Sequence, residues 1–166
     1  MGEIPATNKT VASPAMNGMA GDPLAGFTLL EQPGHLLRRS QQRSADIYAE
    51  EIGTEGPTQP QFALLTAIFQ HPGASQVDLV RHTGIDRSTV AEMAARLVKR
   101  GLLRRERSGD DRRANTLAIS PTGEAWLRDY LPAAQRTQQR LLDPLTEAER
   151  MQLIGLLRRL VESSLQ

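Results

Sequence analysis

The sequence predicts a mainly α-helical protein that contains one small β-hairpin. Apolar residues recur at helical spacing in six segments, and most of these segments begin at a residue type that caps helices. One stretch, residues 102–120, instead alternates apolar and polar residues around the turn sequence SGDD at 108–111. The chain has 166 residues, of which 39% are hydrophobic, so it is long enough for one globular domain with appended helices.

The first predicted helix is long and follows a segment without helical periodicity. Residues 1–28 are rich in Gly, Pro, Ala and Ser, which predicts a flexible N-terminal tail. An amphipathic helix is expected from Leu29 to Gly53, with Pro33 in its first turn, where proline is tolerated. Its apolar stripe consists of Leu29, Leu36, Leu37, Ile47, Tyr48 and Ile52, with the small Ser40 and Ser44 between them.

A second helix is expected to begin after Thr58, whose hydroxyl can accept a hydrogen bond from the first turn. Pro60 fits that first turn, and the sequence His71-Pro72-Gly73 ends the helix. Its apolar face is formed by Phe62, Leu65, Ile68 and Phe69.

Two short helices with a glycine turn between them follow. Ser75 caps the first helix, and the Asp78 carboxylate stabilises the positive, N-terminal end of its dipole. This helix ends at Gly84. Asp86 caps the next helix, which ends at Gly101. Two such helices joined by a short turn that contains glycine are typical of a helix-turn-helix, although an ordinary helical corner has the same pattern. The residues expected to hold the two helices together are Leu79, Val80, Ile85, Val90 and Met93.

Two strands are expected next, at residues 102–103 and 116–120. Leu117 and Ile119 would lie on the apolar face of the second strand, with Thr116, Ala118 and Ser120 on the other. The apolar face can then pack on the helices.

Two further helices complete the chain. Ser120 caps a helix that begins at Pro121 and continues to Leu142, with a kink expected at Pro132. Residues 146–149 (TEAE) fit a capping box for the last helix. That helix has an apolar face made of Leu153, Leu156, Leu157, Leu160 and Val161.

The order helix, helix, hairpin is that of a winged helix-turn-helix, in which the hairpin is the wing. The net charge is only +1, so attraction to a polyanion requires basic residues to be concentrated on one face. A solvated loop would also explain the charge run, but Asp111 lies where it can orient the Arg113 guanidinium for a narrow minor groove. The expected DNA-binding residues are Arg87, Ser88, Thr89, Glu92, Arg96, Lys99, Arg107, Asp111, Arg112 and Arg113.

From about Leu29 onward the chain resembles the MarR family of bacterial transcriptional regulators. The segment TGIDRSTVAEMAARLVKRGLLRRERSGDDRRANTLAISPTGEA is similar to the most diagnostic region of that family, with its Asp-x-Arg at Asp111 and Arg113 and its Ser-Thr-Val at residues 88–90. The resemblance implies a homodimer that binds a near-palindromic, double-stranded DNA operator, usually as a repressor released by a small molecule. It also implies that residues 29–56 and 121–166 form dimerisation helices around a DNA-binding lobe at 57–120.

The leucine-rich face of the last helix supports a dimer independently, because it is larger than a lone terminal helix needs. The alternative is that this helix packs onto its own domain.

In the proteins that this chain resembles, the effector commonly binds between the dimerisation helices and the DNA-binding lobe. Aromatic side chains can form the apolar wall of a ligand site, and an arginine can bind a carboxylate or phosphate, so an aromatic acid or its coenzyme A thioester is favoured as the effector. The alternative is that the aromatic residues belong to the core and the arginines are solvated. The candidates are His35, Arg38, Arg39, Arg43, Phe62, Phe69, Trp126 and Tyr130.

Other classes of function receive little support from the sequence. There is no glycine-rich phosphate loop and no nucleophile elbow, and the histidines lack metal-ligand spacing, so neither an enzyme nor a bound cofactor or metal is expected. The absence of cysteine excludes thiol-based sensing. The sequence has no run of about 18 apolar residues, the length that a membrane-spanning helix needs, so the expected location is cytoplasmic. A winged-helix module that binds protein and not DNA remains the alternative.

Overall fold

The computed structural model describes residues 24–107 and 115–162. It divides at residues 36 and 37 into two units. In the described part of the first unit, a turn closed by the hydrogen bond from Phe27 N to Leu24 O precedes a short 3-10 helix, η1 (Leu29–Glu31). Helix α1 (Pro33–Ile52) then begins, so Leu29 is outside the first long helix and Pro33 is its first residue. Most of the predicted tail, residues 1–23, lies outside the described residues.

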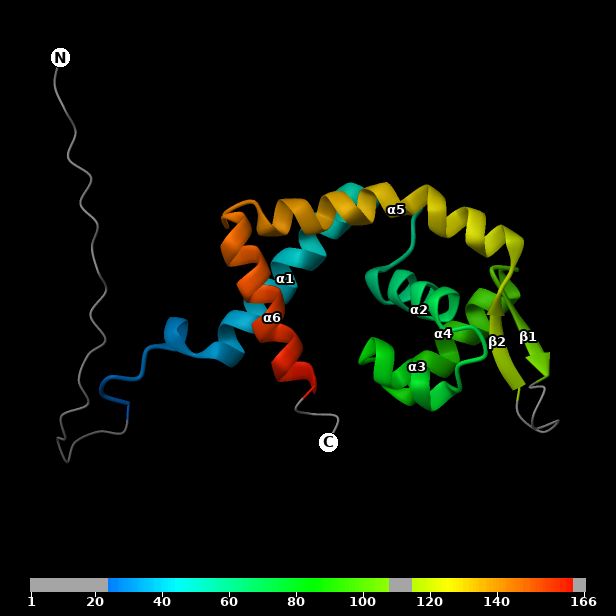
Figure 1. The fold of residues 1–166 in the computed structure, drawn as a ribbon, viewed down its shortest axis with the longest axis horizontal. Helices are drawn as coiled ribbons and strands as arrows, with labels where there is room; N and C mark the ends of the chain where they lie inside the picture. The colour runs from blue at the N-terminus through cyan, green and yellow to red at the C-terminus, as the bar shows by residue number, and fades with distance from the viewer. Residues whose placement is uncertain (1–23, 108–114, 163–166) are drawn as a thin grey trace, which may run out of the picture. The chain divides into compact units, whose positions relative to one another are not determined.

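Three helices of the second unit begin at the predicted capping residues. They are α2 (Gln59–Gln70), α3 (Gln76–Thr83) and α4 (Arg87–Lys99) (Figure 1). The side chains of Thr58 and Ser75 each accept a hydrogen bond within a capping box, and Asp86 Oδ1 accepts one from Thr89 N at 2.9 Å. The local sequence therefore fixes where each helix starts.

The main hydrophobic core joins these helices to the hairpin. Helix α2 contacts α3, α3 contacts α4, and both α2 and α4 contact the hairpin. The fully buried leucines and valine belong to α2, α3 and α4. These residues are Leu64, Leu65, Leu79, Val90 and Leu97. The predicted apolar face of α2 is confirmed at Leu65 and Ile68, but it is wrong at Phe69, which is 44% exposed, and it missed the fully buried Leu64.

The hairpin consists of antiparallel strands β1 (Leu103–Arg107) and β2 (Asn115–Ile119), and Figure 1 shows it beside α4. Its register pairs Leu103 with Ile119 and Arg105 with Leu117. Leu117 and Ile119 pack against the core, as the alternation predicted. The first strand is longer than predicted, because the charged residues 104–107 also pair with the second strand.

Helix α5 (Pro121–Leu142) begins directly at the end of the hairpin. The Ser120 hydroxyl donates to Gly101 O at 2.6 Å and accepts from Gly123 N at 3.0 Å, and Ser120 N donates to Leu102 O at 3.0 Å. The helix continues through Pro132, so the expected kink stays a prediction. One hydroxyl thus links the end of α4, the hairpin and the first turn of α5.

Ion pairs join α5 to α1. Arg136 Nε donates to Glu51 Oε2 at 2.8 Å, and Arg140 bonds both Glu51 and Glu50 at 2.9 and 2.7 Å. Hydrogen bonds from Arg136 and Arg140 lower the pKa of Glu51 below its ordinary value. A smaller apolar cluster of Tyr48, Ile52, Ala133 and Ala134 packs α1 on α5 beside these pairs.

Helix α6 (Glu147–Glu162) begins with the predicted capping box. Thr146 N and Thr146 Oγ1 both donate to Glu149 Oε2, at 2.8 and 2.7 Å. None of its described residues is buried in the single chain. Among the helices described, none is both long and apolar enough to cross a membrane.

Candidate DNA interface and effector cavities

The turn between α3 and α4 has the geometry of a helix-turn-helix. Gly84 ends α3 with φ of +67°, a left-handed conformation that glycine adopts without steric cost. Gln76 Nε2 donates to Arg87 O at 3.3 Å, which connects the start of α3 to the first residue of α4. The second helix of the motif is therefore held with its N-terminal turn at the surface.

The first turn of α4 presents polar side chains to solvent. Arg87 and Ser88 are exposed and Thr89 is half-buried. The Ser88 hydroxyl donates to Asp86 Oδ1 at 2.5 Å, and hydrogen bonds from Ser88 and Thr89 hold the pKa of Asp86 well below its ordinary value. Because the Asp86 carboxylate stays ionised, it fixes this turn while the Ser88 oxygen can still accept from a base.

The middle of α4 carries a charge pair. Arg96 Nη2 lies 3.1 Å from Glu92 Oε2, and both side chains are mostly exposed. Such a surface pair contributes little to stability and is easily exchanged for other partners. Lys99, one turn further on, is also exposed. The structure thus places Arg87, Ser88, Glu92, Arg96 and Lys99 on the accessible surface of one helix.

The wing is described only at its base. Arg107 is the last residue of β1 and pairs with Asn115 of β2. Asp111, Arg112 and Arg113 lie outside the described residues, so their roles stay predictions.

Two of the predicted effector residues line a hollow of about 230 Å³ between α2 and α5, the α2–α5 cavity. Phe62 and Phe69 of α2 face Leu127 and Leu131 of α5 across it. Arg128, on the rim, is hydrogen-bonded to Glu124. The helical spacing of the phenylalanines thus does bring them to one site.

The other two aromatic candidates have partners in the protein itself. Trp126 packs against the core and its ring lies under the Arg100 guanidinium, whose central carbon is 5.2 Å from the ring centroid. Tyr130 meets Trp126 edge-on and packs with the cluster between α1 and α5. Neither residue lines the α2–α5 cavity.

A larger hollow of about 470 Å³ lies between α1 and the start of α2, the α1–α2 cavity. Tyr48, Ala45 and Ile52 form much of its apolar wall, and Gln41 and Gln59 supply polar groups. Sequence reasoning missed this site, since its lining comes partly from the loop before α2. The Tyr48 hydroxyl is buried without a hydrogen-bond partner among the described residues, and burial raises the pKa of Tyr48.

The arginines of α1 do not line either cavity of the same chain. Arg38, Arg39 and Arg43 are exposed. Arg38 precedes Gln41 by three residues and Ala45 by seven, so it lies on the cavity face of α1, whereas Arg39 is rotated away by one position. His35 lies in the first unit and is half-buried.

Two of the histidines lie side by side in the structure. His71 and His82 stack with their ring centroids 3.9 Å apart and nearly parallel. Residues 24–107 and 115–162 contain no group of three or more acidic, histidine or cysteine side chains that could hold a metal ion.

Comparison with known proteins agrees with this architecture. A model of the MarR family matches residues 58–114. The HTH-type transcriptional repressor NicR of Pseudomonas putida is 30% identical over 137 residues, which cover 82% of this chain and 87% of NicR.

Two solved structures are similar over most of the chain. BpsR of Bordetella bronchiseptica, whose DNA binding is regulated by 6-hydroxynicotinic acid, has a TM-score of 0.77 at 35% identity, covering 81% of this chain and 96% of its own. PcaV of Streptomyces coelicolor, solved in complex with its natural ligand, has a TM-score of 0.72 at 34% identity, covering 88% and 99%. With its winged helix-turn-helix and relatives that align along most of their length, the chain belongs to the MarR family of transcriptional regulators.

Proposed function

We propose that this protein is a homodimeric transcriptional repressor that binds an operator in double-stranded DNA and is released by a small aromatic acid. The observation that carries the proposal is the α3–α4 turn, which exposes the first turn of α4, a helix that also contacts the hairpin. NicR is named as a repressor, and BpsR is a DNA-binding protein regulated by a small acid. Such a protein works where the chromosome is, in the cytoplasm.

An apolar surface on α6 supports the dimer. Several large apolar side chains on this helix are exposed in the single chain, which is costly in water unless another surface covers them. They are Met151, Ile154, Leu156, Leu157, Leu160 and Val161, with exposures from 36% to 64%. A second copy that uses the same helix buries this surface in a two-fold arrangement.

The test of DNA binding is a footprint of the purified protein on an operator selected from random duplexes. A two-fold dimer is expected to protect two patches about one helical turn, roughly 34 Å, apart. Size measurement in the same buffer should give a dimer. A single patch protected by a monomer would contradict the dimer, and failure to retain any duplex at low salt would favour the protein-binding alternative.

The α1–α2 cavity is the proposed effector site. Its volume of about 470 Å³ falls in the range of ligand pockets, which suits a single-ring acid better than a whole coenzyme A thioester. Gln41 and Gln59 offer polar contacts. Arg38 is not part of the lining, but it lies one turn before Gln41 on the same face of α1, and it is proposed to bind the carboxylate at the edge of the cavity. Phe62, which lines the α2–α5 cavity, contacts Tyr48 of the α1–α2 cavity edge-on, with ring centroids 6.5 Å apart.

Effector binding is expected to weaken operator binding by the same factor by which DNA weakens effector binding, because the two equilibria are linked. A panel of aromatic acids and their coenzyme A thioesters, titrated by calorimetry and gel shift, measures both factors. Arg38→Ala should lose acid binding, whereas Arg39→Ala, the matched control on the neighbouring position, should keep it. If Arg38→Ala binds the acid as tightly as the parent, the anchor assignment is wrong. If only the thioesters release the protein from its operator, the effector site is not the α1–α2 cavity.

A further inference from the structure

Arg105 occupies an unusual place on the hairpin. The register pairs it with Leu117, and it shares a strand face with the buried Leu103, so it lies on the side of the hairpin that faces the helices. Arg104 lies on the opposite face and pairs with Glu106 at 2.8 Å. No ion-pair partner of Arg105 is found in the part of the chain that the structure describes.

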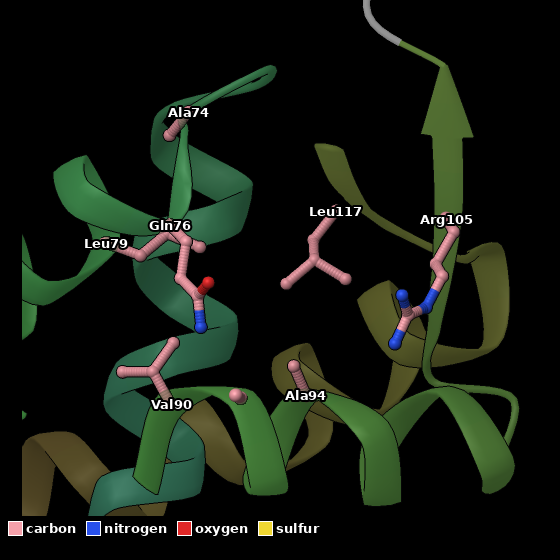
Figure 2. A pocket seen from close by; sticks show the side chains of 8 residues that line it. Ala74, Gln76, Leu79, Val90, Ala94, Arg105 and Leu117 are labelled. Atoms are coloured by element: carbon pink, nitrogen blue, oxygen red, sulfur yellow. The ribbon is translucent and has the colours of Figure 1, made fainter. Parts of the chain in front are cut away.

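The side chain of Arg105 is directed into a hollow of about 190 Å³ between the hairpin, α3 and α4, the hairpin pocket (Figure 2). Gln76 lies on the opposite side, and the floor is apolar, with the buried Leu79 and Val90. Small residues, Ala74, Ala91 and Ala94, leave the space open. The pocket therefore has one cation and one amide at its edges, and both groups can donate to an oxyanion.

The position of this pocket matters once α4 and the wing are placed on DNA, as the proposed function requires. If α4 enters the major groove and the hairpin tip enters the adjacent minor groove, the sugar-phosphate backbone that separates the two grooves passes across the gap between them. The hairpin pocket lies in that gap, between α4 and the base of the hairpin. The exposed Arg105 guanidinium, which has no ion-pair partner among the described residues, would then lie close to the phosphates.

We propose that Arg105 binds the backbone phosphate that crosses between the recognition helix and the wing, with Gln76 as a second donor. This inference rests on the proposed function, since it assumes that the protein binds DNA. Arg105 in this role positions the protein on the duplex and does not read its sequence, because phosphates are the same at every base pair. The competing explanation is that its aliphatic stem merely covers Leu117 and the apolar floor.

The test compares Arg105→Ala with Arg104→Ala, the neighbour on the other face of the same strand. Arg105→Ala should bind the operator at least about tenfold more weakly, as expected for one charged hydrogen bond. It should also reduce the slope of log affinity against log salt concentration by about 1, to a similar extent on operator and random DNA. Arg104→Ala should change the slope less. Arg105→Lys should keep most of the slope, because it keeps the charge.

A duplex with single neutral methylphosphonates, placed one at a time along the operator, then locates the contact. For the parent protein one position per half-site between the two grooves should weaken binding, and for Arg105→Ala the same substitution should have no further effect. If folded Arg105→Ala keeps the parent's salt slope and methylphosphonate profile, the proposal is overturned even though the protein binds DNA. Saturable binding of inorganic phosphate to the DNA-free parent that is lost in Arg105→Ala, while operator affinity and salt slope stay unchanged, would also overturn it by assigning the pocket to a free anion. No DNA binding by the parent would instead contradict the proposed function.

Discussion

Gly123→Val is expected to destabilise the protein by about 3 kcal/mol or more, at the upper end of the cost of overpacking a core. A Cβ atom at Gly123 would lie 2.0 Å from Leu102 O and 3.0 Å from the Ile119 side chain. The first of these is a backbone atom that already accepts a hydrogen bond from Ser120 N, so it cannot move without separating the hairpin from α5. Urea unfolding followed by circular dichroism, at one fixed protein concentration, measures the change.

Ala125→Val is the matched control for Gly123→Val. It adds a β-branched side chain two residues further along α5, where Ala125 is exposed, so only a small loss of helix propensity is expected. Equal unfolding midpoints for Gly123→Val and the parent would mean that the hairpin and α5 do not meet as the structure has them.

Arg113→Ala is expected to weaken operator binding by about 1 to 3 kcal/mol while the protein stays folded. The physical reason is that a narrow minor groove concentrates negative potential, which an inserted guanidinium matches. A gel shift at several salt concentrations measures the loss. Arg128→Ala removes an arginine of α5 that is hydrogen-bonded to Glu124 and should leave affinity nearly unchanged. Unaltered affinity of folded Arg113→Ala would exclude the wing as the minor-groove contact.

The helix starts could be predicted from the sequence because capping is a local interaction. Thr58, Ser75, Asp86 and Ser120 each bond a backbone group three residues away, so the relevant partners are adjacent in the chain. The extent of β1 could not be predicted in the same way. Residues 104–107 are charged and have weak strand propensity, and they are extended because β2 pairs with them.

The surface of α4 followed from helical periodicity, but the surroundings of the aromatic residues did not. Phe62 and Phe69 share a cavity, whereas Trp126 packs under Arg100, the C-cap residue of α4. Contacts between residues far apart in sequence depend on how the helices pack, and no local pattern contains that information. The burial of the Tyr48 hydroxyl and the position of Arg105 on the inner face of the hairpin also depend on this packing, so they could not be predicted from the sequence.

A single hydroxyl, that of Ser120, links the end of α4, the hairpin and the start of α5. We expect these hydrogen bonds to make the junction rigid. Because α4 and the hairpin both meet α5 at this hydroxyl, we expect them to move together when the first turn of α5 changes direction. In the proposed dimer, the direction in which α5 extends from this junction then sets the distance between the two recognition helices. If an effector acts as proposed, a change in this direction would mismatch both half-sites of the operator at once, without contact to any residue that binds DNA.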